Sequence, residues 1–190
     1  MKNTLRLALA TAGFLGALSA QAAPQFFNGH YYDYINNTSG GFTQDEALAD
    51  AAGRSHLGMT GYVATVTSLA EQNFIFSSVS NLTAWLGGND RGTEGSFTWV
   101  NGPESGSAFG FTFWSGGEPN DCCSGEDDVV INWGGDGSWN DIGLPSFPDY
   151  RVGYIIEYSG TPVSVPEPGA LALAGIALAG LGSMRRRQKP

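Results

Sequence analysis

The segment 118–128 reads EPNDCCSGEDD and holds five carboxylates, one amide and both cysteines of the chain. Further oxygen-bearing side chains lie at Asp90 and Glu94 in GNDRGTEG, and at Asn140 and Asp141 in WND. Uncompensated carboxylates in one place repel each other, so such a loop is either well solvated or ordered by cations. Calcium takes about six to eight oxygen ligands and accepts them from scattered loops. These residue types therefore leave a calcium site and a solvated acidic surface as alternatives.

The elements that must position these donors are short. Two Ser/Thr-x-x-Glu capping boxes predict helices at about 43–54 and 68–79, the second with Leu69, Phe74 and Ile75 facing the core. Strands are predicted from aromatic and β-branched runs at 26–35, 61–68, 84–88, 96–100, 127–133, 137–141 and 151–158.

Between Val100 and Asp128 no regular element is predicted. A loop of that length in a compact domain is usually functional or held by a ligand. The hydrophobic content of 42% is enough for a core, and 28 glycines point to a loop-rich fold rather than a helical bundle.

The order of WLGG, EPN, WND and GYIIEY, after two capped helices, resembles the C-type lectin domain over about residues 26–159. The resemblance implies an α+β, C-type lectin-like fold over residues 25–160. In that fold two helices pack on small antiparallel sheets that carry a long calcium-binding loop.

The resemblance also implies a sugar-binding calcium site made by Glu118, Asn120, Glu126, Asn140 and Asp141. Three carboxylates and two amides would surround one Ca²⁺ and leave positions open for two neighbouring sugar hydroxyls, which also bond to the carboxylates and amides. The EPN form of the motif implies mannose, glucose, N-acetylglucosamine or fucose as the ligand.

A second, auxiliary calcium site is implied at Asp90, Glu94, Asp121 and Asp127, with the main-chain oxygen of Glu126 as a further ligand. The family resemblance also predicts a cis peptide bond before Pro119, which an X-Pro bond adopts at modest cost.

The chain lacks the disulfides that the family usually contains. Ala51 and Ile156 stand where one pair is expected, and Asp128 and Leu144 stand where the other is expected. Since both partners of each pair are missing, we expect packing to replace the bridges.

Cys122 and Cys123 are adjacent and additional to the family pattern. Neighbouring Cα atoms lie closer than is usual for a disulfide. A vicinal disulfide, two free thiols and an intermolecular bridge therefore remain as alternatives.

The two ends of the chain carry export signals. Residues 1–22 have a basic start, a short apolar run and a small-residue ending, which predicts a secretory signal peptide. Residues 161–190 contain VPEP, an apolar stretch at 169–183 and an arginine cluster, and resemble a PEP-CTERM sorting signal, which implies that the apolar stretch is a short transmembrane segment. The resemblance implies export across the inner membrane, processing by an exosortase-type protease, and a place on the cell surface or in an extracellular matrix.

Charge restricts the partners. Residues 23–164 contain three arginines and 17 acidic residues, a net charge of −14. Such a surface excludes nucleic acid and anionic membranes as partners, so membrane contact is expected only through the terminal sorting segment.

Three functions compete. The first is calcium-dependent carbohydrate binding, for instance to exopolysaccharide in a biofilm, and the second is a structural or protein-binding surface domain stabilised by calcium. A glycoside hydrolase is disfavoured, because a calcium-bound carboxylate makes a poor general acid and His30 and His56 lack a nucleophile motif. We therefore expect no enzymatic activity. Among the tryptophans, Trp114 lies best in the sequence to stack on a sugar, while the others are expected in the core.

Overall fold

The structure is a computed structural model that describes residues 23–160. The predicted signal peptide at 1–22 and sorting segment at 161–190 lie outside the described residues. Within residues 23–160, no helix combines the length and apolarity needed to cross a membrane. The expected transmembrane stretch at 169–183 is not part of this range.

The chain begins with a hairpin of β1 (Gln25–Phe27) and β2 (His30–Ile35). The single strand predicted at 26–35 is therefore wrong. Asn28 and Gly29 adopt positive φ angles of 49° and 93° and form the tight turn between the two strands. An Asn-Gly pair is the usual sequence for such a turn, because both positions need left-handed backbone.

The first predicted helix is confirmed as α1 (Gln44–Ala52). Its capping box is complete, because the Thr43 side chain accepts the Glu46 N–H and the Glu46 side chain accepts the Thr43 N–H. A short strand pair that the sequence did not indicate follows, β3 (Ser55–His56) with the first residues of β4 (Met59–Val63).

The second predicted helix is α2 (Leu69–Phe74), extended by a π-helical turn, η1 (Ile75–Val79). Ile75 is fully buried, but the prediction for Leu69 is wrong, because its side chain is 51% exposed. Leu69 and Ile75 are six positions apart, so at 3.6 residues per turn their side chains do not share one face of the helix.

The second capping box is only half formed. The Ser68 side chain accepts the Glu71 N–H, as expected. The buried Glu71 carboxylate does not turn back to Ser68; it accepts the Thr67 N–H at 2.8 Å and the Tyr32 hydroxyl at 2.7 Å. This glutamate therefore ties the start of α2 to β2.

The remaining strands complete one connected sheet. They are β5 (Ala84–Asn89), β6 (Thr98–Trp99), β7 (Glu126–Ile131), β8 (Trp139–Pro145) and β9 (Gly153–Tyr158). The main order is β1-β2-β9-β5-β7-β8, with β4 also paired to β9 and β6 to β5. All pairs are antiparallel except β5 with β9. The predicted α+β class is thus confirmed, but the strands form one connected sheet with a parallel pair rather than several small antiparallel sheets.

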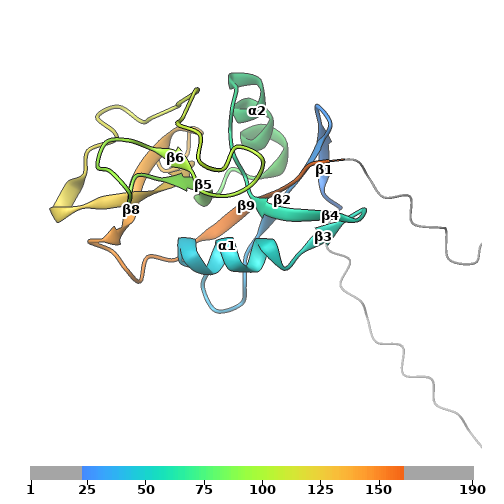
Figure 1. Ribbon diagram of the computed structural model, residues 1–190, viewed down its shortest axis with the longest axis horizontal. Coiled ribbons are helices and arrows are strands. Elements are labelled where there is room, and N and C mark those ends of the chain that lie inside the picture. Colours follow the sequence, from blue (N-terminus) through green and yellow to red (C-terminus); the bar gives the residue numbers. More distant parts are fainter. Residues whose placement is uncertain (1–22, 161–190) are drawn as a thin grey trace, which may run out of the picture.

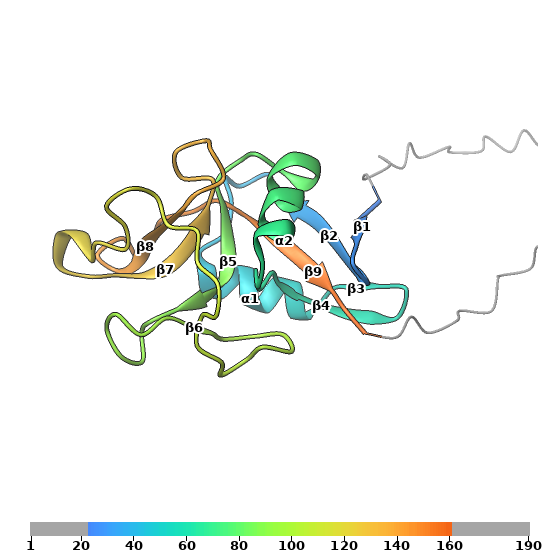
Figure 2. The ribbon, with the colours of Figure 1, turned by 90° about the horizontal axis from the view of Figure 1, so that it is seen from above.

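Strand β9 lies at the centre of the domain, and all of its residues are buried. Figure 1 shows α1 and α2 on opposite sides of it, and Figure 2 shows the same arrangement from above. Neighbouring residues of one strand contribute to two cores: Ile155 packs with Ile75 on one side, and Ile156 with Ala51 on the other. Because side chains alternate along a strand, one buried strand supports both helices.

The core around Ile156 occupies the place of the first missing disulfide. Ala51 and Ile156 are both fully buried in the same hydrophobic cluster. A Cβ atom on the neighbouring Gly61 would lie 2.6 Å from Ile156 Cδ1, which shows how closely this side chain fills the space. Packing thus takes the place of a bridge here, as expected.

An ion pair occupies the place of the second missing disulfide. The Leu144 N–H points to the Asp128 carboxylate at 3.4 Å. Arg91 donates to both carboxylate oxygens of Asp128, from Nε at 2.7 Å and from Nη2 at 2.8 Å. The same guanidinium pairs with Asp45 at 2.7 Å, but Asp45 is mostly exposed whereas Asp128 is buried.

We expect these two ion pairs to differ in their contribution to stability. Asp128→Asn should lower the free energy of unfolding by about 3 kcal/mol, because it leaves a partly buried guanidinium without its main counter-charge. The control Asp45→Asn should lower it by at most about 1 kcal/mol, since water screens an exposed pair. Urea unfolding in EDTA measures both, and equal effects would contradict this account.

Candidate functional site

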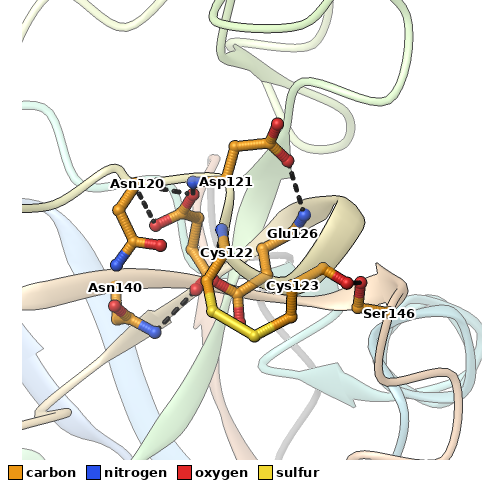
Figure 3. The surroundings of a disulfide bond; sticks show 8 residues. Asn120, Asp121, Cys122, Cys123, Glu126, Asn140 and Ser146 are labelled. Atoms are coloured by element: carbon orange, nitrogen blue, oxygen red, sulfur yellow. Dashed lines mark hydrogen bonds between the residues drawn. A yellow bond between two sulfur atoms is a disulfide. The ribbon is translucent and has the colours of Figure 1, made fainter.

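The predicted sugar-site residues gather where the long loop meets the β7–β8 hairpin. Glu126 begins β7, and the register pairs Val129 with Asp141 and Val130 with Asn140. The loop before β7 returns to this hairpin. Figure 3 shows Asn120 from the loop near Asn140 and Glu126 from the hairpin. The Glu118–Pro119 peptide bond is cis, which confirms the expectation for it.

The Asp141 carboxylate holds the EPN segment in place. It accepts the Asn120 N–H at 3.1 Å on each oxygen and the Asp121 N–H at 2.8 Å on Oδ2. Asp141 is almost fully buried. Asn140, the residue before it, is also buried and donates from Nδ2 to the Asp141 main-chain oxygen at 2.6 Å.

Glu126 is held by the loop that precedes it. Its Oε2 accepts the Cys122 N–H at 3.2 Å, and its own N–H donates to Asp121 Oδ1 at 3.0 Å. Its side chain is buried. Backbone N–H groups thus orient two of the three carboxylates proposed for the sugar-site calcium.

Two buried oxygens at this site have no hydrogen-bond partner among the described residues, Glu118 Oε2 and Asn140 Oδ1. Leaving a buried polar atom unsatisfied costs about 1–3 kcal/mol, so such atoms usually have a partner. Carboxylate and amide oxygens are the ligands that calcium prefers. The residues present therefore fit a hard divalent cation.

The electrostatics agree with this fit. Burial, the adjacent Asp141 carboxyl and the charge of Glu126 raise the pKa of Glu118 to about 7. Burial and the charge of Asp141 also raise the pKa of Glu126. Each carboxylate thus disfavours the ionised form of its neighbour, and a cation between them would reverse that effect.

A second acidic cluster lies beside the first. Asp90, Glu94 and Asp127 offer ligand atoms that all lie within 4.8 Å of one another. Asp90 Oδ1 is buried without a partner among the described residues, while Oδ2 accepts the Gly95 N–H at 2.8 Å. Burial and the charges of Glu94 and Asp127 raise the pKa of Asp90 to about 6.

Asp121, the fourth residue assigned to the auxiliary site, does not join this cluster. Its carboxylate accepts the Glu126 N–H and points away from Asn120 and Asn140 (Figure 3). The structure thus brings together three of the four auxiliary residues. Asp121 instead connects the two ends of the segment 121–126, which contains both cysteines.

Cys122 and Cys123 are joined to each other by a disulfide, one of the three alternatives for them (Figure 3). The Cys123 main-chain oxygen accepts the Ser146 hydroxyl at 2.9 Å, which attaches the loop to the segment after β8. Gly125 follows with φ +129°, and a Cβ there would lie 2.5 Å from Pro145 Cγ. Only glycine therefore fits between this loop and Pro145.

His30 has a structural contact rather than a catalytic one. Its Nδ1 contacts the buried Glu157 carboxylate, which also accepts the Tyr62 hydroxyl at 2.5 Å and the Thr65 N–H at 3.2 Å. The hydrogen bond to Glu157 raises the pKa of His30. Sequence reasoning missed this cluster because its members are far apart in the chain and belong to no local motif.

Comparisons with known proteins give two family matches. The profile of the lectin C-type domain matches residues 49–143, which is half of the chain. The PEP-CTERM protein-sorting motif matches residues 164–187. Halomucin of Haloquadratum walsbyi is 36% identical over 143 residues, which cover 70% of this chain and 2% of halomucin. The chain thus spans a small part of this relative.

Two solved structures are similar to the described domain. The carbohydrate-recognition domain of cow CD23, solved in the presence of a GlcNAc2Man3 oligosaccharide, has 26% identity and a TM-score of 0.57. The match covers 75% of this chain and 98% of that domain. The lectin CEL-I of Cucumaria echinata has 24% identity and a TM-score of 0.59, covers 75% of this chain and 99% of CEL-I, and supports the fold.

We expect the cation-free protein to lose stability as the pH rises. A carboxyl whose pKa is raised in the folded state stabilises the fold fully below its unfolded pKa, and this stability is lost through the folded pKa. For Glu118 this interval runs from the usual value of 4.5 to about 7. The melting temperature in EDTA should therefore fall between these pH values, and Glu118→Gln should fall less. Asp149→Asn, away from the site, is the control, and an equal fall in all three proteins would contradict this expectation.

Proposed function

The chain belongs to the C-type lectin domain family, and we propose that it is a calcium-dependent carbohydrate-binding protein for mannose, glucose, N-acetylglucosamine or fucose. Family membership identifies a binding domain rather than an enzyme. The sorting motif at 164–187 adds that the chain is an exported, processed protein.

The observation that carries the proposal is the pair of buried oxygens at Glu118 and Asn140 that have no hydrogen-bond partner within residues 23–160. They lie in a group of three carboxylates, two of them buried, in which the pKa of Glu118 is raised to about 7. Without a cation this arrangement is unfavourable twice, through desolvation and through repulsion. Bound Ca²⁺ would replace this repulsion with attraction and would offset the cost of desolvation, since the carboxylates would then ligate a positive charge.

Sugar binding would use the carboxylates and the amides of the site in different ways. The five residues are Glu118, Asn120, Glu126, Asn140 and Asp141. The bound cation would polarise two neighbouring hydroxyls of a sugar. The carboxylates accept hydrogen bonds from those hydroxyls, and the amide groups of Asn120 and Asn140 donate to them. Because the Asp141 carboxylate accepts the Asn120 N–H, the positions of donors and acceptors are set before the sugar arrives.

The EPN sequence at Glu118–Asn120 supports mannose-type ligands. The similar domain of cow CD23 was solved with an oligosaccharide that contains mannose and N-acetylglucosamine. Asp90, Glu94 and Asp127 would hold an auxiliary calcium ion beside this site. That ion would stiffen the loop through Asp127, whose main-chain oxygen accepts the Asp90 N–H at 3.2 Å.

The arrangement of the domain suits display on a surface or in a matrix. Figures 1 and 2 show the start of β1 and the end of β9 on the side of the domain that lies away from β7 and β8. The sorting motif follows β9 in the sequence. We infer that an exosortase-type protease processes the chain, and that the processed protein presents its site away from the attachment point, to exopolysaccharide.

We expect a glycan array to show binding to mannose-type sugars in calcium and no binding in EGTA. Glu126→Gln should abolish binding, because it removes one ligand charge and leaves a buried amide in its place. Asp149→Asn, an exposed carboxylate outside the site, should bind like the unchanged protein. Binding that persists in EGTA would count against the proposal.

A structural or protein-binding surface domain is the alternative function. The compact cluster of Asp90, Glu94 and Asp127 favours it, since this cluster can hold calcium for stability without any sugar. The double variant Glu118→Gln with Asn120→Asp separates the two functions. Carbohydrate binding predicts a shift toward galactose, whereas a purely structural calcium predicts no sugar binding before or after the change.

A further inference from the structure

An aromatic groove of about 390 Å³ lies beside the proposed sugar site. Its apolar surface comes from the half-buried side chains of Phe97, Phe109 and Trp114. Its size is within the usual range of small-ligand sites, about 300–1,000 Å³. The calcium ligands described above do not line it, so its chemistry is separate from theirs.

The groove begins at the sugar site itself. Pro119, which lies between Glu118 and Asn120, is exposed and forms part of its wall. Gly95 and Ser96 also line it, and they follow Glu94 of the auxiliary cluster in the chain. A chain of sugars held at Glu118 and Asn120 can therefore continue into the groove.

The groove and the site share one backbone framework. The main-chain N–H of Trp139 donates to the main-chain oxygen of Phe113 at 2.8 Å. The main-chain oxygen of Trp139 accepts the Ser115 N–H, also at 2.8 Å. These bonds fix Trp114 against the start of β8, one residue before Asn140. The position of the groove relative to the proposed calcium ligands is thus set by the sheet rather than by a free loop.

The aromatic side chains form a rigid surface. Phe109 stacks on the buried Trp99, with ring centroids 4.0 Å apart. Trp114 packs edge-to-face on the buried Trp139 at 5.7 Å and lies 4.9 Å from Phe97. Phe97 and Phe109 lie 5.7 Å apart, so the three rings of the groove also support one another, and each keeps part of its surface exposed to a ligand.

The polar groups of the groove are hydroxyls. Ser96, Thr98 and Thr112 line it, and none of the groove-lining residues carries a charge. A pyranose ring has the complementary surface, with an apolar face of C–H groups and a rim of hydroxyls. An uncharged groove in a strongly acidic domain disfavours ionic ligands but suits a neutral saccharide.

On the basis of the proposed function, we propose that this groove is a second saccharide subsite. It binds the sugar residue next to the one held at the calcium, with the apolar face of that residue on Trp114 and Phe97. The protein then recognises a segment of a neutral polysaccharide rather than a single terminal sugar. This assignment gives Trp114 a role in ligand selection in addition to its packing on Trp139.

The test compares one sugar with two by titration calorimetry in calcium. For mannose, the probes are methyl α-mannoside and the mannobioses of each linkage. We expect at least one disaccharide to bind about tenfold more tightly than the methyl glycoside, which corresponds to one good aromatic contact. Ala108→Trp, at an exposed groove position, should remove this gain and leave methyl mannoside affinity within about twofold.

Controls separate the groove from folding. Ala49→Trp adds the same side chain at an exposed position of α1 and should change neither affinity. Trp114→Phe should reduce the disaccharide gain only in part, because it keeps an aromatic ring. Melting temperatures of all variants in calcium identify any that fails to fold, and Ala108→Trp removes no core contact.

The outcomes distinguish this inference from the function on which it rests. If neither monosaccharide nor disaccharide binds in calcium, both proposals fail. If methyl mannoside binds but no disaccharide binds more tightly, or if Ala108→Trp weakens both equally, the subsite alone is overturned. A larger gain from octyl mannoside than from any disaccharide also overturns it, because the groove then takes an alkyl group instead of a sugar.

Discussion

The hydrogen bonds from the Asn120 and Asp121 N–H groups to the Asp141 carboxylate hold the loop region to the sheet. A loop of this length has little regular structure of its own, so its conformation depends on such contacts. The same carboxylate lies beside Glu118 and raises its pKa. One buried side chain therefore serves two purposes: it orders the loop, and it creates the concentration of negative charge that a cation would neutralise.

The rest of the domain shows how a fold of this family is stabilised without its usual bridges. Ile156 on the central strand β9 fills the space beside Ala51, and Arg91 pairs with Asp128 in the other location. Both solutions depend on burial, since the apolar contact and the ion pair gain strength where water is excluded. The disulfide between Cys122 and Cys123 does not replace a family bridge. It lies in the exposed loop before β7 and joins residues that are already neighbours in the chain.

The two ends of the domain have different chemistry. Strands β7 and β8, at one end of the domain in Figure 2, carry Glu126 and Asp141, and an uncharged groove lined by Phe97, Phe109 and Trp114 lies beside the proposed site. The other end carries β1 and the end of β9, after which the sorting motif follows in sequence. This separation supports the proposal that the processed protein presents its binding region toward a matrix.

Local sequence determined much of this protein. Features that depend on neighbouring residues could be predicted from the sequence alone. They are the capping box at Thr43, the cis bond before Pro119 and the order of the EPN and WND motifs. Contacts between distant residues could not be predicted in this way: the exposure of Leu69 and the Arg91–Asp128 pair follow from how the elements pack. The direction of Asp121 and the groove at Trp114 belong to the same class. Spacing along the chain specifies which oxygens and rings are present, but only the folded sheet decides which of them meet, because burial and side-chain direction are properties of the whole packed domain.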